Sequence, residues 1–175
     1  MNTTPIRHVD LQAMAKQAML ENGFEPEFPP QVQQELGELK AHPPQVAPGT
    51  NIRDLRNLPW SSIDNDTSRD LDQIEVAERL PNGETKILVG IADVDTFVPK
   101  SSAIDDHAGK ETTTVYTGVK NFPMLPEQLS TDTSSLLEAG DKLSIVIEFV
   151  VGIDGVIHSG SIYQALVRNK TQLRE

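Results

Sequence analysis

The chain has 175 residues, of which 37% are hydrophobic and 23% charged, and its formal net charge is −11 at pH 7. Such a length suits one domain with its own core, and no apolar run approaches the roughly 20 residues of a membrane-spanning helix. Because the sequence has no cysteine, disulfides, thiolate nucleophiles and cysteine-ligated zinc are excluded. The acidic balance argues against affinity built on lysine and arginine contacts to phosphates. A nucleic-acid enzyme of this composition must hold cations or use basic surface from elsewhere.

Residues 1–40 predict a small helical segment ahead of the main core. Residues 10–22 are rich in helix formers and are followed by Gly23, which suits a C-terminal cap. Residues 30–39 predict a second helix, and the prolines and glycine after it predict an extended linker over residues 41–51. Because the N-terminus lacks the apolar core of a secretion signal, we expect a cytoplasmic protein.

Short β-type runs dominate after residue 60. Residues 85–94 are almost continuously apolar and follow an Asn-Gly pair, which predicts a hairpin turn and then a strand buried on both faces. Ser101 or Ser102 is expected to cap a helix that includes Lys110.

The C-terminal third predicts a second hairpin. Residues 143–151 alternate at period two, with the odd-numbered apolar side chains on one face. Asp154 and Gly155 predict the turn into a strand over residues 156–167. The last residues read as the opening of a helix, so we expect the chain to end inside a domain. The predicted fold class is α+β, with a mixed or antiparallel sheet and flanking helices.

The most informative segment holds five carboxylates within twelve residues: Asp64, Asp66, Asp70, Asp72 and Glu75. Carboxylates this close repel one another unless water, a basic partner or a cation compensates. Hard cations such as Mg²⁺ take oxygen ligands, and two such ions can activate a water and stabilise the leaving oxygen in phosphodiester cleavage. A solvated acidic loop is the simpler alternative, but the apolar Ile63 and Leu71 beside the acids indicate anchoring to the core.

A calcium-binding loop is a further alternative. Counted from Asp64, oxygen-bearing residues fall at positions 1, 3, 5, 7, 9 and 12, as in an EF-hand loop. The position that needs glycine for its sharp turn is Arg69, and Pro59 interrupts any entering helix. We therefore rank calcium binding below a metal-dependent nuclease.

The same segment resembles the catalytic domain, the RNB domain, of the ribonuclease II/R family. That family's signature is an aspartate, five residues, an aspartate, one residue and two adjacent aspartates. Here Asp64, Asp70 and Asp72 match, and Gln73 stands in the last place. The likeness continues in order through VGIADVDTFV, SSAIDDHAGKETTTVY, FPMLPEQLS and DKLSIVIEF. It covers roughly residues 52–175, the N-terminal portion of an RNB-type domain.

The resemblance implies a 3′→5′ exoribonuclease that hydrolyses single-stranded RNA with metal-activated water. It makes Asp64, Asp70 and Asp72 the catalytic residues that face Mg²⁺, with Mn²⁺ as the alternative ion, and it gives Gln73 a weak place among the metal ligands. It matches Tyr116 to a tyrosine near the 3′-terminal nucleotide, where an aromatic ring can stack on a base. From the residues alone, Tyr116 is an ordinary core aromatic.

Gln73 is the main departure from the family pattern. An amide oxygen carries no charge, so one metal site is weakened or shifts onto Asp66 or Glu75. Asp93, in the matching strand motif, is at least as well explained by a structural hydrogen bond as by catalysis.

The family's downstream portion, with its basic RNA contacts, has no counterpart in the chain. We therefore expect as partners single-stranded RNA and the missing remainder of the RNB domain, on the same or another chain, and no membrane. The chain alone is expected to be inactive. The alternative function is a degenerate module that binds RNA or protein without catalysis.

Overall fold

The computed structural model describes residues 9–44, 51–65 and 71–174. The chain divides into two compact units. One unit combines residues 1–40 with 99–126, and the other combines residues 41–98 with 127–175. Every helix in the described part of the chain is too short or too polar to cross a membrane.

The first unit contains α-helices, and the three helices predicted within it are confirmed. Helix α1 spans Leu11–Glu21 and begins at Asp10, whose carboxylate accepts the Ala13 N–H at 3.0 Å. Helix α2 spans Pro30–Ala41, and α3 spans Ala103–Glu111. The Ser102 hydroxyl caps α3 by accepting the Asp105 N–H. A two-stranded ribbon of β5 (Val115–Tyr116) and β6 (Asn121–Phe122) completes the unit.

Residues far apart in the sequence hold this unit together. The Glu35 carboxylate on α2 accepts the N–H groups of Ala103 and Ile104, at 2.7 and 3.0 Å. These are unpaired donors of the first turn of α3, where a negative charge also suits the helix dipole. The ring of Phe28 lies 4.3 Å from that of the buried His107 on α3. The N-terminal helices therefore share one core with α3.

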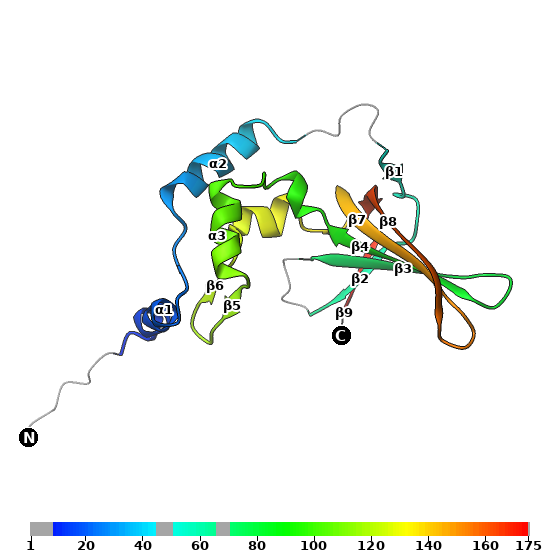
Figure 1. The fold of residues 1–175 in the computed structure, drawn as a ribbon, viewed down its shortest axis with the longest axis horizontal. Coiled ribbons are helices and arrows are strands. Elements are labelled where there is room, and N and C mark those ends of the chain that lie inside the picture. The colour runs from blue at the N-terminus through cyan, green and yellow to red at the C-terminus, as the bar shows by residue number, and fades with distance from the viewer. Residues whose placement is uncertain (1–8, 45–50, 66–70, 175) are drawn as a thin grey trace, which may run out of the picture. The chain divides into compact units, whose positions relative to one another are not determined.

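The second unit is built on a seven-stranded mixed sheet, which confirms the α+β fold class (Figure 1). Its strand order is β1-β8-β7-β4-β3-β2-β9. The strands are β1 (Arg53–Asp54), β2 (Ser61–Asp64), β3 (Gln73–Arg79), β4 (Thr85–Ala92), β7 (Asp141–Val151), β8 (Ile157–Arg168) and β9 (Thr171–Arg174). A 3-10 turn at Val94–Thr96 and a π-helical turn at Gln128–Thr133 lie in the connections.

Both predicted hairpin turns are confirmed, whereas the predicted C-terminal helix is wrong. Gly83 and Gly155 have φ values of 88° and 82°, the left-handed conformation that glycine adopts without a steric penalty. The residues that suggested an opening helix form β9 instead, parallel to β2. Strand β2 presents a backbone edge there, and pairing with it satisfies more backbone groups than one isolated helical turn can.

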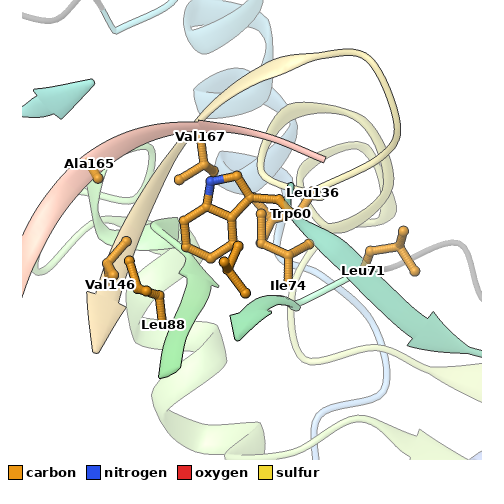
Figure 2. Packing of buried hydrophobic residues seen from close by; sticks show 9 residues of the cluster. Trp60, Leu71, Ile74, Leu88, Leu136, Val146, Ala165 and Val167 are labelled. Atoms are coloured by element: carbon orange, nitrogen blue, oxygen red, sulfur yellow. The ribbon is translucent and has the colours of Figure 1, made fainter. Parts of the chain in front are cut away.

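The core of the sheet unit surrounds Trp60, the single tryptophan of the chain (Figure 2). Its side chain is fully buried, and its indole N–H donates to the Leu55 carbonyl at 2.8 Å. Gly90 on β4 makes room for the ring: a Cβ there would lie 3.3 Å from Trp60 Cζ3 and 2.9 Å from the Ser144 hydroxyl. Figure 2 shows Ile74, Leu88 and Val146 around the indole.

The opposite face of the sheet is only partly covered, so the prediction that β4 is buried on both faces is wrong for this chain. Leu88 and Gly90 are buried, but Ile87 and Val89 are half-buried and Ile91 is 39% exposed. The odd-numbered side chains of β7 share this second face, because Val89 pairs with Ile147 and Ile147 with Ile162 of β8. Ile162 is 71% exposed.

Candidate active site

Asp64 lies at the end of β2, close to the Trp60 core. Strand β2 pairs with β3 at Ser61 and Glu75 and with β9 along its whole length. The Lys170 N–H donates to the Trp60 carbonyl at 2.9 Å, which fastens the start of this segment. Asp64 is therefore held on a strand whose root is anchored in the core.

The other predicted metal ligands lie around the loop that follows. Asp66 and Asp70 fall outside the described residues, so their predicted roles stay predictions. Asp72 and Gln73 are described, and both are exposed at the start of β3.

Leu71 fixes the backbone next to Asp72. Its side chain is fully buried, and its N–H donates to the Ser135 hydroxyl at 2.9 Å. Its carbonyl accepts the Leu136 N–H, also at 2.9 Å. The predicted anchoring by Leu71 is confirmed, whereas that by Ile63 is wrong, because Ile63 is 61% exposed.

Two carboxylates of this region contain buried oxygens without a partner. Oδ2 of Asp64 and Oε2 of Glu75 are removed from solvent and accept no hydrogen bond. Burial raises the pKa of Glu75, and the negative charge of Asp64 raises it further. Each buried oxygen lacks the partner that a carboxylate requires, and a cation is a partner of suitable charge.

The described residues alone do not assemble a complete metal cage. With residues 66–70 left aside, no group of three or more acidic or histidine side chains lies close enough to hold an ion. Mg²⁺ does not require such a cage, because it is commonly held by one or two carboxylates together with water and substrate phosphates. The orphaned Asp64 oxygen fits that mode of binding.

The strands around the acidic loop differ from the setting of an EF-hand, and the calcium alternative stays a prediction. An EF-hand loop joins two helices, whereas this loop joins strands β2 and β3.

Tyr116 is exposed, whereas Asp93 is buried. Tyr116 is 67% exposed on β5, so its interpretation as a core aromatic is wrong. Tyr116 belongs to the helical unit and the carboxylates to the sheet unit. Asp93 is buried, and its Oδ2 accepts from the Thr96 hydroxyl at 2.9 Å and from the Gln164 amide. These bonds support the structural role expected for Asp93.

Comparison with known proteins identifies the family. Residues 52–174 match the model of the RNB domain. The chain belongs to the RNB domain family. Ribonuclease R of Thermotoga maritima is 34% identical to this RNB chain over 149 residues, which cover 84% of the chain and 21% of that protein. The match confirms the resemblance to the RNB family.

Solved structures extend the likeness. The structure of Mycoplasma genitalium RNase R in complex with ribose methylated single-stranded RNA matches with a TM-score of 0.82 at 29% identity. The match covers 93% of the RNB chain and 25% of that chain. This coverage exceeds residues 52–174, so it reaches into the N-terminal helices.

The RNB fold by itself does not decide catalysis. Yeast Ssd1, described as a pseudonuclease, matches with a TM-score of 0.63 at 15% identity, over 71% of this chain and 16% of that one. At such identity the likeness shows the fold alone. The RNB chain also spans only about a fifth of the Thermotoga relative. The side chains around Asp64, rather than the fold, must carry the functional argument.

Proposed function

We propose that this chain forms the metal-binding portion of a 3′→5′ exoribonuclease that hydrolyses single-stranded RNA. The observation that carries the proposal is the buried, unpartnered Oδ2 of Asp64. Asp64 lies within the matched residues 52–174 and resembles the first aspartate of the family pattern. A buried carboxylate oxygen without a partner is destabilising, and such an arrangement is typical of a site that a ligand completes.

The carboxylates and Gln73 have different roles in this proposal. Asp64 and Asp72 hold a divalent cation through their oxygens, and Asp70 joins them by its place in the family pattern. Gln73 offers a neutral oxygen to the ion or to its water. When bound, Mg²⁺ or Mn²⁺ supplies a Lewis acid for the scissile phosphate and lowers the pKa of an attacking water. The exposed ring of Tyr116 offers a stacking face for a terminal base.

A chimera tests whether these residues are competent for catalysis. Residues 52–174 of this chain replace the matching segment of Thermotoga maritima Ribonuclease R, and a 5′-labelled single-stranded RNA is followed with Mg²⁺ present. We expect progressive shortening from the 3′ end, which Asp64→Asn or Asp72→Asn abolishes while RNA binding persists. Shortening that survives Asp64→Asn would refute the role of that residue.

The same chimera distinguishes the non-catalytic alternative, which the neutral Gln73 favours. A degenerate module would bind the RNA and leave it intact, and Gln73→Asp would produce a large gain in rate. An enzyme that works with glutamine at this position would shorten RNA without the substitution and gain little from it. The chain by itself is expected to release no nucleotides, since it lacks most of the length of its relatives.

We also propose that the remainder of an RNB domain is the partner of this chain. The partly covered face of the sheet supports this. Val89, Ile147 and Ile162 form one apolar row across β4, β7 and β8. Ile162, at the β8 end of this row, is 71% exposed. Burying such a row removes apolar area from water at about 25 cal/mol per Å².

Ile162→Asp is expected to leave the melting temperature of the chain nearly unchanged and to weaken its association with a separately produced remainder of the domain. His158→Asp, on the same strand near the Asp154–Gly155 turn, is the control. Equal association by both variants would show that the remainder docks elsewhere.

A further inference from the structure

A buried asparagine lies between the two ends of the acidic loop, residues 65–70. Asn169 directly follows β8, and its side chain is buried. The amide nitrogen donates to the Ser62 hydroxyl at 3.3 Å and to the Leu136 carbonyl at 3.0 Å. The amide oxygen accepts the Thr171 N–H at 3.2 Å. Both amide protons and the oxygen therefore have the partners that a buried amide requires.

The same network reaches the other end of the loop through Leu71. The Ser135 hydroxyl accepts the Leu71 N–H at 2.9 Å, and the Leu136 N–H donates to the Leu71 carbonyl, also at 2.9 Å. Leu136 thus uses its N–H toward Leu71 and its carbonyl toward Asn169. A continuous series of hydrogen bonds connects Leu71 with Ser62. We call these five residues the bracket: Ser62, Leu71, Ser135, Leu136 and Asn169.

Strand pairing alone does not hold the two ends of the loop together. Within the described residues, β2 and β3 pair at a single position, Ser61 with Glu75. The bracket joins the two strands nearer the loop, at residues 62 and 71. It is itself anchored, because Leu71 and Leu136 are buried in the Trp60 core (Figure 2).

Each end of the bracket lies beside a predicted metal ligand. Ser62 and Asp64 are two residues apart on β2, so their side chains project from the same face of that strand. At the other end, Leu71 immediately precedes Asp72. A buried polar network whose members all have partners favours one arrangement over its alternatives. The bracket therefore limits how far the two aspartates can move apart.

We infer that Ser135 and Asn169 are positioning residues, which fix the separation of Asp64 from Asp72. The inference rests on the proposed function, which assigns both aspartates to one cation. Removing a group that orients a metal ligand typically weakens metal binding by about 10–100-fold. Ser135 and Asn169 carry no charge and act on the ion only through the backbone that they hold.

The first measurement follows the loop ends without any metal. Because the chain has no cysteine, nitroxide labels can be attached solely at Ile63→Cys and Gln73→Cys. Both residues are exposed, and one lies on each side of the loop. Electron paramagnetic resonance then gives the distribution of distances between the labels, and its width reports how firmly the two ends are held.

The second measurement follows metal binding by the full chain without labels. Mn²⁺ is titrated into the protein, and free Mn²⁺ is detected by its own paramagnetic resonance signal. Melting in EDTA, followed by Trp60 fluorescence, shows whether each variant is folded.

Three variants are compared in both measurements. Ser135→Ala removes the acceptor of the Leu71 N–H, and Asn169→Asp keeps the size of the side chain but loses both donated bonds. Ser144→Ala is the matched control. Ser144 is fully buried in the same unit, and its hydroxyl donates to the Ile91 carbonyl at 2.9 Å, between β7 and β4. The control therefore removes a buried hydrogen bond of the same kind outside the bracket.

We expect Ser135→Ala and Asn169→Asp to broaden the distance distribution and to weaken Mn²⁺ binding about tenfold or more. Ser144→Ala should lower the melting temperature, yet keep the distribution and the Mn²⁺ affinity of the unsubstituted chain. If the bracket served stability alone, all three variants would melt earlier and none would change either readout.

The two measurements separate this inference from the proposed function. An unchanged distribution in folded Ser135→Ala overturns the inference, even if Asn169→Asp does not fold, and so does equal broadening by Ser144→Ala. A broader distribution with unchanged Mn²⁺ affinity also overturns it, because the separation would not matter to the ion. If the unsubstituted chain binds no Mn²⁺, the metal dependence of the proposed function is wrong, and the distance distribution still decides whether the bracket holds the loop ends.

Discussion

Gly90→Ala tests the packing of β4 against Trp60 and against Ile74 of β3. A Cβ at this position would lie 2.9 Å from the Ser144 hydroxyl, 3.2 Å from Ile74 Cγ1 and 3.3 Å from Trp60 Cζ3. Ile74 and Trp60 are both fully buried and cannot move aside without disturbing the core. Overpacking a core typically costs about 1–3 kcal/mol, whereas replacing glycine with alanine restricts the unfolded chain and returns about 0.4–1 kcal/mol. We expect the free energy of unfolding to fall by about 1–2 kcal/mol.

Gly160→Ala is the matched control on β8. Its Cβ would meet only the Glu148 carbonyl at 3.6 Å and Phe149 Cβ at 4.0 Å, which are ordinary contacts. The same substitution should therefore leave stability unchanged or raise it by up to about 1 kcal/mol.

Urea unfolding of both variants can be followed by tryptophan fluorescence, because Trp60 is the single tryptophan and lies in the core concerned. A difference of 1 kcal/mol corresponds to roughly 2–4 °C in melting temperature for a chain of this size. If Gly90→Ala is as stable as Gly160→Ala, the Trp60 ring does not need the space above Gly90, and the packing argument fails.

Three further predictions concern other parts of the chain. Burial lowers the pKa of His107 below its ordinary value, so the unfolded state binds the proton more tightly than the folded state does. The helical unit should therefore lose stability as pH falls below about 6.5. His107→Leu should flatten this pH dependence of the melting temperature, measured by circular dichroism between pH 7.5 and 5. Asp93→Ala should lower the melting temperature of the sheet unit, because the Thr96 hydroxyl and the Gln164 amide lose their acceptor. The loss should reduce the free energy of unfolding by about 1–3 kcal/mol. An unchanged melting temperature would show that water replaces the carboxylate. Tyr116→Ala in the RNB chimera should weaken binding of a fluorescent oligonucleotide by about 1–3 kcal/mol. Tyr116→Phe is the control, because it keeps the stacking face. An equal loss of affinity in both variants would show that the hydroxyl, rather than the ring, contributes to binding.

Local sequence patterns were sufficient for α1, α2, α3 and the two hairpin turns. Asp10 and Ser102 cap helices through their own side chains, and Gly83 and Gly155 adopt the conformation that their turns require. These features depend on residues a few positions apart, so a linear pattern contains them. The ordered motifs likewise identified the RNB family, because each motif is a contiguous run.

Contacts between distant residues decided the rest. Strand β9 exists because Thr171 meets Ser61 across more than a hundred residues, which no local pattern records. Both faces of β4 are largely apolar, so the sequence of the strand could not tell that Trp60 would cover the face that contains Leu88 and Gly90.

The same distinction between local sequence and contacts of distant residues applies to the candidate site. The sequence by itself determined which acids are available, their order and the missing charge at Gln73, since these are properties of composition and spacing. Only the tertiary structure decided that Asp64 and Glu75 each have a buried oxygen without a hydrogen-bond partner, and that Tyr116 is exposed. Burial and electrostatic interaction depend on distance in space, and the pairing of strands brings together groups that the chain itself keeps apart.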